Sequence, residues 1–186
     1  MGFNKRGKLK EKKKQAFLTD EELDKIIKTA TIPRDYLLLN FLRYTGMRVG
    51  EVVQIRKKDI HFKDRLIIIG PKITKTKRER HRVIAKPLFK LLKRYCDMIG
   101  DEDSVLFPIT IQRVWQIVKD HTNKAKINKP VHPHTFRHSL GTYTYKKTGD
   151  IKKVAHVLGH RSLASSDIYT HLTDEDGKKI EDELWD

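Results

Sequence analysis

Histidine, arginine and tyrosine side chains recur in four short segments of this sequence, at spacings that suit chemistry on a phosphate. The segment HPHTFRHS, at residues 132–139, holds His134 and Arg137 three positions apart, so both project from one face if it is helical. An arginine presents a fixed fork of donors that matches a phosphate, and a histidine carries a proton near neutral pH. Three further segments each add one residue, namely Arg48 in TGMRVGE, His160 in LGHRS and Tyr169 in IYTH. In this order they describe a site where a tyrosine attacks a phosphodiester.

Such a site works without a metal ion. A phenol with a pKa of about 10 is a poor nucleophile at neutral pH. Two arginines on the scissile phosphate stabilise phenolate character and the charge of the pentacoordinate state. A histidine takes the tyrosine proton, and a lysine protonates the departing 5′ oxygen. Guanidinium groups then do what Mg²⁺ does in most phosphoryl transfers, so we expect no cofactor and no metal.

Metal binding is the alternative interpretation of the histidines. His134 and His138 lie four residues apart, and His132 is close by in the sequence. The glutamate of an HExxH motif is missing, however, and no second pair of ligands is evident. The single cysteine, Cys96, excludes a thiolate-rich site. We therefore favour proton transfer and phosphate binding.

The composition indicates a polyanionic partner. The chain has 186 residues, enough for one domain, and 40 Lys and Arg against 24 Asp and Glu give a net charge of +16. Nucleic acid is favoured over a membrane surface as that partner. A lone cysteine suits a reducing compartment, and no apolar run approaches the ~18 residues that cross a bilayer. We expect a soluble cytoplasmic protein, associated with the nucleoid, with no membrane partner.

Caps, stops and apolar spacing predict a mainly helical fold. Residues 1–16 carry seven Lys and Arg against Glu11 and are expected to form a flexible basic arm or linker stub. Thr19 and Glu22 have the spacing of a capping box, where the fold is expected to begin. Helices are then expected from Thr19, from Pro33 to a stop at Gly46, from about Arg48, over 87–99, from Thr110, around His134, over 151–158 and from about Thr173.

The expected helices also predict which side chains are buried. Trp115 is assigned to an apolar face of the helix that follows Thr110, and Ile151 to the inner face of 151–158. In the central helix Phe136 faces the core, which leaves Arg137 on a different face with His134.

A small antiparallel sheet interrupts the helices, which makes the predicted fold class α+β. Strands are expected at 60–62, 66–69 and 82–85. The hairpin loop at 71–80 is basic and contains Lys72, Lys75, Lys77, Arg78 and Arg80. Such a loop can deliver a lysine to a phosphate, or it can simply be solvated.

With these segments in this order, the chain resembles the catalytic domain of the tyrosine recombinases, the phage-integrase and Xer-like family. The resemblance covers about residues 17–186 and includes the nine-residue step from His160 to Tyr169. It implies the catalytic-domain fold of that family for 17–186. The family usually has a core-binding domain before this domain, and here only the basic arm of residues 1–16 comes before it. We therefore expect either an excised catalytic domain or a naturally minimal enzyme, without a core-binding domain in this sequence.

The resemblance also implies a role for each site residue. Arg48 and Arg137 clamp the phosphate, and His134 is the general base. His160 hydrogen-bonds a non-bridging oxygen, and Tyr169 forms a 3′-phosphotyrosyl bond. Lys75 in the TKT segment matches the hairpin lysine of the family, with Lys72 and Lys77 as alternatives.

The implied partner is double-stranded DNA, on which four protomers assemble through the C-terminal tail. The implied function is site-specific recombination. Two alternatives remain: nicking and rejoining like a type IB topoisomerase, and a DNA-binding module without catalysis.

Overall fold

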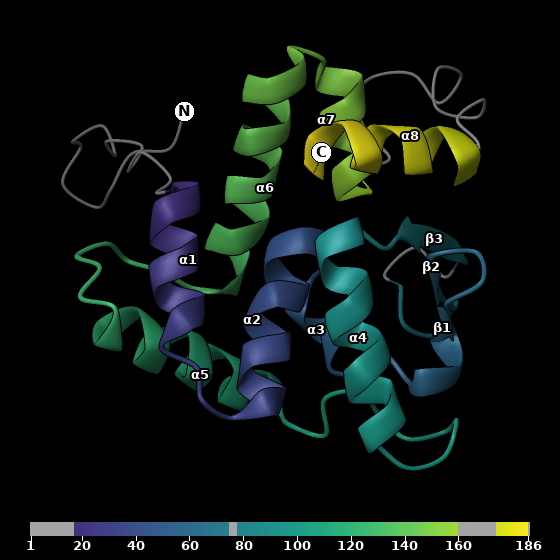
Figure 1. Cartoon of the computed structure of the whole chain (residues 1–186), viewed down its shortest axis with the longest axis horizontal. Helices are drawn as coiled ribbons and strands as arrows, with labels where there is room; N and C mark the ends of the chain where they lie inside the picture. The colour runs from purple at the N-terminus through teal and green to yellow at the C-terminus, as the bar shows by residue number, and fades with distance from the viewer. Residues whose placement is uncertain (1–16, 75–77, 160–173, 186) are drawn as a thin grey trace, which may run out of the picture.

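Helices dominate the structure, a computed structural model that describes residues 17–74, 78–159 and 174–185 (Figure 1). The described elements, in chain order, are α1 (Asp20–Lys28), α2 (Pro33–Thr45), α3 (Val49–Val52), the 3₁₀ helix η1 (Lys57–Asp59), β1 (Ile60–His61), β2 (Leu66–Ile69), β3 (Arg80–Val83), α4 (Lys86–Met98), α5 (Ile111–Lys124), α6 (Pro133–Thr148), α7 (Ile151–Leu158) and α8 (Asp174–Trp185). The predicted fold class, mainly helical with a small antiparallel sheet, is confirmed.

Local signals define several of these boundaries. Thr19 and Glu22 form the predicted capping box, in which each side chain bonds the backbone N–H of the other residue. Gly46 ends α2 with a φ of +54°, a left-handed conformation that favours glycine. A Cβ there would also lie 2.9 Å from a methyl group of Leu140 on α6, so the end of α2 approaches α6 closely.

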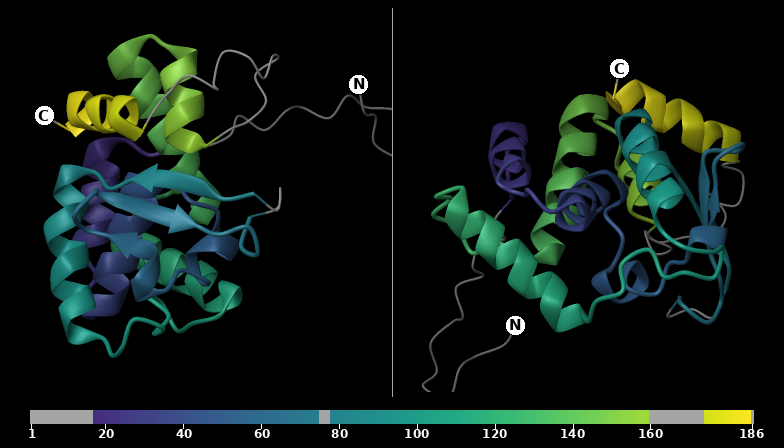
Figure 2. Two further views of the ribbon diagram at one scale, coloured as in Figure 1. Left: turned by 90° about the vertical axis from the view of Figure 1, so that its right-hand side faces the viewer. Right: turned by 60° about the horizontal axis from the view of Figure 1, so that its bottom comes forward.

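The sheet has the order β1-β2-β3, and both pairings are antiparallel. Figure 2 shows its strands on one side of the molecule, next to α4. The third strand lies two residues earlier than the predicted 82–85, because its register pairs Leu66 with Val83 and Ile69 with Arg80. Ala85 is already the N-cap residue of α4, which ends the strand before it.

Two groups of buried apolar side chains hold the elements together. The larger one includes Phe41, Phe107 and Phe136 and joins α1, α2, α4, α5, α6 and the sheet. The smaller one lies where α6, α7 and α8 meet, and includes Leu140, Val157, Ile180 and Leu184. In this structure the C-terminal helix therefore packs on its own domain (Figure 1). Among the described residues no helix is long and apolar enough to span a membrane.

Candidate active site

Arg48 is held at the start of α3 by the carboxylate of Glu51. It is the N-cap residue of that one-turn helix, and its backbone N–H donates to Oε2 of Glu51 at 3.1 Å. Its Nη1 lies 3.4 Å from Oε1 of the same carboxylate, and its side chain is 38% exposed. The guanidinium is thus oriented from one side and remains accessible to a ligand from the other.

Glu51 also binds an arginine from the sheet. It is buried, and its Oε2 accepts from Nη2 of Arg80 on β3 at 2.5 Å. Arg80 lies at the base of the basic hairpin, so one carboxylate connects the hairpin to the segment that carries Arg48. Sequence reasoning counted Arg80 only among the basic residues of the loop.

Arg137 projects inward from α6, whereas it was predicted to leave the core side of the helix. Its side chain is buried, and it donates from Nη1 to the carbonyl of Gly46 and from Nη2 to the carbonyl of Leu158 at 2.6 Å. Carbonyls at the last turn of a helix lack partners within that helix, and those of α2 and α7 are both close to α6. The predicted exposure was wrong because a tertiary contact supplies polar partners for a charged side chain on a buried face.

His134 lies one turn before Arg137 and is exposed. Arg137 in turn binds the carbonyl of Gly46, two residues before Arg48. The structure therefore brings Arg48, His134 and Arg137 into one region, from two elements far apart in the sequence.

Three consecutive carbonyls at the end of α7 each accept a hydrogen bond from a different arginine. Val157 accepts from Arg82, Leu158 from Arg137, and Gly159 from Arg80 at 3.4 Å. These carbonyls belong to the last described residues before His160 in the sequence. The backbone that leads to His160 is thereby anchored by the same guanidinium groups that surround Arg48.

The arginines make this region strongly positive. Burial, together with the charges of Arg48, Arg82 and Arg80, lowers the pKa of Arg137 to about 10. Burial also lowers the pKa of Arg80 and Arg82. All remain protonated at neutral pH. A bound anion would relieve this repulsion, and a phosphate group is the anion that matches the arginine fork.

Three predicted site residues, Lys75, His160 and Tyr169, lie outside the described residues. Of the alternative lysines, Lys77 also lies outside them, whereas Lys72 is exposed at the turn after β2. The assignment of the catalytic lysine stays a prediction.

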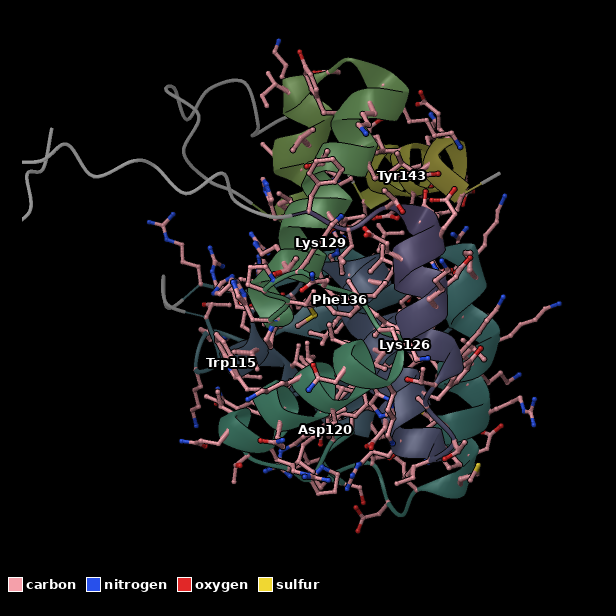
Figure 3. The ribbon with its side chains drawn as sticks, turned by 90° about the vertical axis from the view of Figure 1, so that its left-hand side faces the viewer. Trp115, Asp120, Lys126, Lys129, Phe136 and Tyr143 are labelled. Atoms are coloured by element: carbon pink, nitrogen blue, oxygen red, sulfur yellow. The ribbon has the colours of Figure 1, made fainter. Side chains whose placement is uncertain are left out.

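The histidines of residues 132–139 have separate surroundings. The ring of His132 stacks on Trp115 of α5, with the ring centroids 5.3 Å apart, and meets His134 edge-on at 6.4 Å. Trp115, which was assigned to an apolar face of this helix, is 43% exposed. Figure 3 shows it at the outer edge of α5, away from Phe136. Among the residues that the structure describes, no three His, Cys, Asp or Glu side chains are grouped as metal ligands would be.

Sequence reasoning missed the roles of Arg80, Arg82 and Glu181. Arg80 and Arg82 are two positions apart on β3, so their side chains lie on the same face of the strand. Both donate to carbonyls at the end of α7. Their spacing of i and i+2 would have been a signal of this face only for a strand that begins at Arg80, whereas the strand was predicted at 82–85. Glu181 on α8 had no such signal, because its partner Arg82 lies 99 positions earlier in the sequence.

A protein-family model and several curated proteins are similar to this chain. The model of the "Phage integrase family" matches residues 16–176. Tyrosine recombinase XerD of Chlorobaculum tepidum is 31% identical over 169 residues, which cover 84% of this chain and 55% of that protein. Tyrosine recombinase XerA of Pyrococcus furiosus is 35% identical over 170 residues, covering 84% and 57%. The chain thus spans little more than half the length of these curated relatives.

Solved structures show the same fold. The crystal structure of XerA recombinase matches with a TM-score of 0.70 at 28% identity, covering 89% of this chain and 61% of that one. The XerH site-specific recombinase, bound to its difH substrate in a pre-cleavage complex, matches with a TM-score of 0.66 at 28% identity, covering 86% and 51%.

Proposed function

This chain belongs to the phage integrase family, and from that membership we propose that it is the catalytic domain of a site-specific DNA recombinase. Residues 17–186 form the domain in this proposal, and residues 1–16 are a basic arm or linker. The domain cuts one DNA strand and rejoins it through a 3′-phosphotyrosyl intermediate. The relatives that match over most of the chain are named tyrosine recombinases, which supports this assignment.

The observation that carries the proposal is the cluster of arginines around Arg137, in which Arg137 and Arg82 are buried. Burial and the neighbouring charges of Arg48, Arg80 and Arg82 lower the pKa of Arg137. The cluster is therefore built for an anion. A phosphodiester in the transition state carries more negative charge than in the ground state, so the cluster stabilises the transition state more strongly.

Each step of the reaction has a proposed residue. His134 accepts the proton of Tyr169 while the phenolic oxygen forms a bond to phosphorus. The bond from phosphorus to the 5′ oxygen breaks, and Lys75 gives that oxygen a proton. Arg48, Arg137 and His160 hold the non-bridging oxygens. Religation runs the same steps in reverse with a new 5′-hydroxyl as nucleophile.

Double-stranded DNA is the proposed substrate, and the protein acts at the nucleoid in the cytoplasm. The net charge of +16 supports a polyanionic partner, and a similar recombinase was solved bound to its DNA substrate. In this structure α8 packs on its own domain through a small apolar cluster and ion pairs such as Arg65–Asp182. We further propose that four protomers assemble on DNA by docking α8 on a neighbouring subunit instead. A chain that lacks residues 174–186 should then fail to form tetramers on DNA. Normal tetramers from that chain would refute this assembly.

Trapping of the covalent intermediate tests the proposed function. The chain is incubated in EDTA with a pool of nicked duplexes of randomised sequence, from which the cleaved end diffuses away. We expect a covalent protein–DNA adduct that Tyr169→Phe abolishes, while Tyr145→Phe, at an exposed tyrosine of α6, retains it. Binding without any adduct would indicate a DNA-binding module instead. Plasmid relaxation without strand exchange between two sites would indicate a topoisomerase.

A further inference from the structure

Two buried arginines connect the same two helix ends. Arg137 donates to the carbonyls of Gly46 and Leu158. Arg82 donates to the carbonyl of Tyr44 at 3.3 Å and to that of Val157. Both guanidinium groups therefore link the end of α2 to the end of α7, and each satisfies carbonyls that have no partner within their own helices.

These two helix ends lead directly to proposed site residues. The chain passes from the end of α2 to Arg48, and from the end of α7 to His160. Arg82 itself lies on β3, whose preceding loop contains Lys75. The position of Arg82 thus fixes the hairpin against both segments that supply phosphate ligands. Its side chain is buried, and its guanidinium contacts the carbonyls of Tyr44 and Val157 and the carboxylate of Glu181.

The charge of Arg82 is balanced by the C-terminal helix. Oε1 of Glu181 on α8 lies 3.4 Å from Nη2 of Arg82, and the two side chains are 2% and 7% exposed. Nε1 of Trp185 donates to the other carboxylate oxygen at 2.9 Å, which orients the carboxylate. A buried cation without its partner is strongly unfavourable, so loss of Glu181 would displace Arg82 or admit water around it.

We propose that Arg82 is a positioning residue for strand cleavage, and that docking of α8 completes the site because Glu181 neutralises Arg82. This inference rests on the proposed function. The helix that follows Tyr169 in the sequence is thereby coupled to the segments that carry Arg48, His160 and Lys75. A site of this kind reaches its working geometry only when an α8 helix is in place.

Backbone hydrogen exchange of the free protein tests the coupling without relying on activity. Glu181→Gln removes the charge that faces Arg82. The matched control Glu183→Gln removes a carboxylate of the same helix that pairs with Lys153 at the surface. We expect Glu181→Gln to accelerate amide exchange in both the 42–52 and 154–159 segments, and Glu183→Gln to leave both unchanged. Acceleration confined to α8, or equal in the two variants, would overturn the proposal.

Single-turnover formation of the covalent adduct tests the consequence for cleavage. For Arg82→Gln and Glu181→Gln we expect the maximal rate to fall about 10- to 100-fold, with a half-saturating DNA concentration within about twofold of the wild type. Arg82→Lys should recover part of the rate, because an ammonium can still donate to the carbonyls. If Arg82→Gln does not fold, Glu181→Gln and Arg82→Lys decide the test.

Active-site titration separates positioning from simple loss of folded protein. A lower adduct yield with an unchanged rate per active molecule would mean a structural role only and would contradict the inference. If the wild-type chain forms no adduct at all, the proposed function fails, and the exchange measurement still decides whether α8 is coupled to the site.

Discussion

Arg80 on β3 donates to Glu51 on α3 at 2.5 Å, although the two residues lie 29 positions apart in the sequence. Through this contact the carboxylate that orients Arg48 is also bonded to the base of the basic hairpin. The base of the hairpin and Arg48, the proposed phosphate ligand, are therefore held in relation to each other by one carboxylate. Preorganisation of this kind is what a site needs if its charges are to act in the transition state.

Replacement of Glu51 should slow formation of the covalent adduct without weakening the affinity for DNA. In Glu51→Gln, Arg48 and Arg80 lose their shared carboxylate, so their positions loosen. We expect adduct formation to slow by about 10²-fold, as for a small misplacement of a catalytic group. DNA affinity should stay equal or rise, because a negative charge is removed from a basic site. Glu102→Gln, at an exposed carboxylate beside Lys57, is the matched control and should change neither quantity. Equal losses of affinity and rate would contradict this account.

The identity of the catalytic lysine can be read from chemical rescue. A 5′-bridging phosphorothiolate has a sulfur leaving group that departs without a proton, so it bypasses the general acid. We expect Lys75→Ala to cleave the phosphorothiolate DNA although it does not cleave ordinary DNA. His134→Ala should cleave neither. Lys72→Ala should cleave ordinary DNA normally. Rescue of Lys72→Ala or Lys77→Ala in place of Lys75→Ala would move the role to that lysine.

Affinity for DNA should depend steeply on salt. With a net charge of +16, the chain is expected to bind DNA mainly through phosphate contacts, each of which releases condensed counterions. We expect the logarithm of the association constant to fall linearly with the logarithm of salt concentration, by about 0.9 per phosphate contact. Titration of a labelled duplex between low and physiological salt measures the slope. A flat dependence would exclude phosphate-driven binding.

Stability should decrease when the solution becomes mildly acidic, in part through His156 between α7 and α8. Burial, and then the charge of Arg82, lowers the pKa of His156 below the value of about 6.5 for an unfolded chain. Above that value both states are neutral and His156 has no effect. As the pH falls through it, the unfolded state binds the proton first, so the free energy of unfolding decreases until the folded-state pKa is passed.

Chemical denaturation at a series of pH values checks this expectation. In His156→Gln the free energy of unfolding should decrease less steeply than in the wild type. The difference should reach up to about 1.4 kcal/mol per pH unit between the folded-state pKa of His156 and about 6.5. His61→Gln, at an exposed histidine of β1, should follow the wild type. An unchanged pH dependence in His156→Gln would mean that its protonation is not linked to folding.

Most of the elements could be predicted because their signals are local. The capping box of Thr19, the stop at Gly46 and the apolar run of β2 each lie within a few residues. The inward face of α7 was only partly right, since Ile151 is 52% exposed whereas Val157 is fully buried. Among the described residues no element covers Ile151 in the first turn of this short helix, and periodicity alone does not reveal that.

The contacts of the site could not be predicted, for a different reason. The motifs located Arg48, His134 and Arg137, but their spacing contains no information about long-range hydrogen bonds. Arg137 is buried only because α2 and α7 both end beside α6. The pairing of Arg82 with Glu181 depends on the docking of α8. Each of these is a tertiary consequence that single-sequence patterns do not encode.

The mass of the DNA-linked peptide tests the central claim most directly. Trypsin cuts after Arg161 and Lys178, so it should release residues 162–178 as one fragment, which contains a single tyrosine, Tyr169. After cleavage of a suicide substrate in EDTA and nuclease trimming, we predict that this peptide carries the nucleotide mass, with the modification at Tyr169. An adduct on the peptide with Tyr143 and Tyr145, or no adduct under conditions where DNA is bound, would contradict the account.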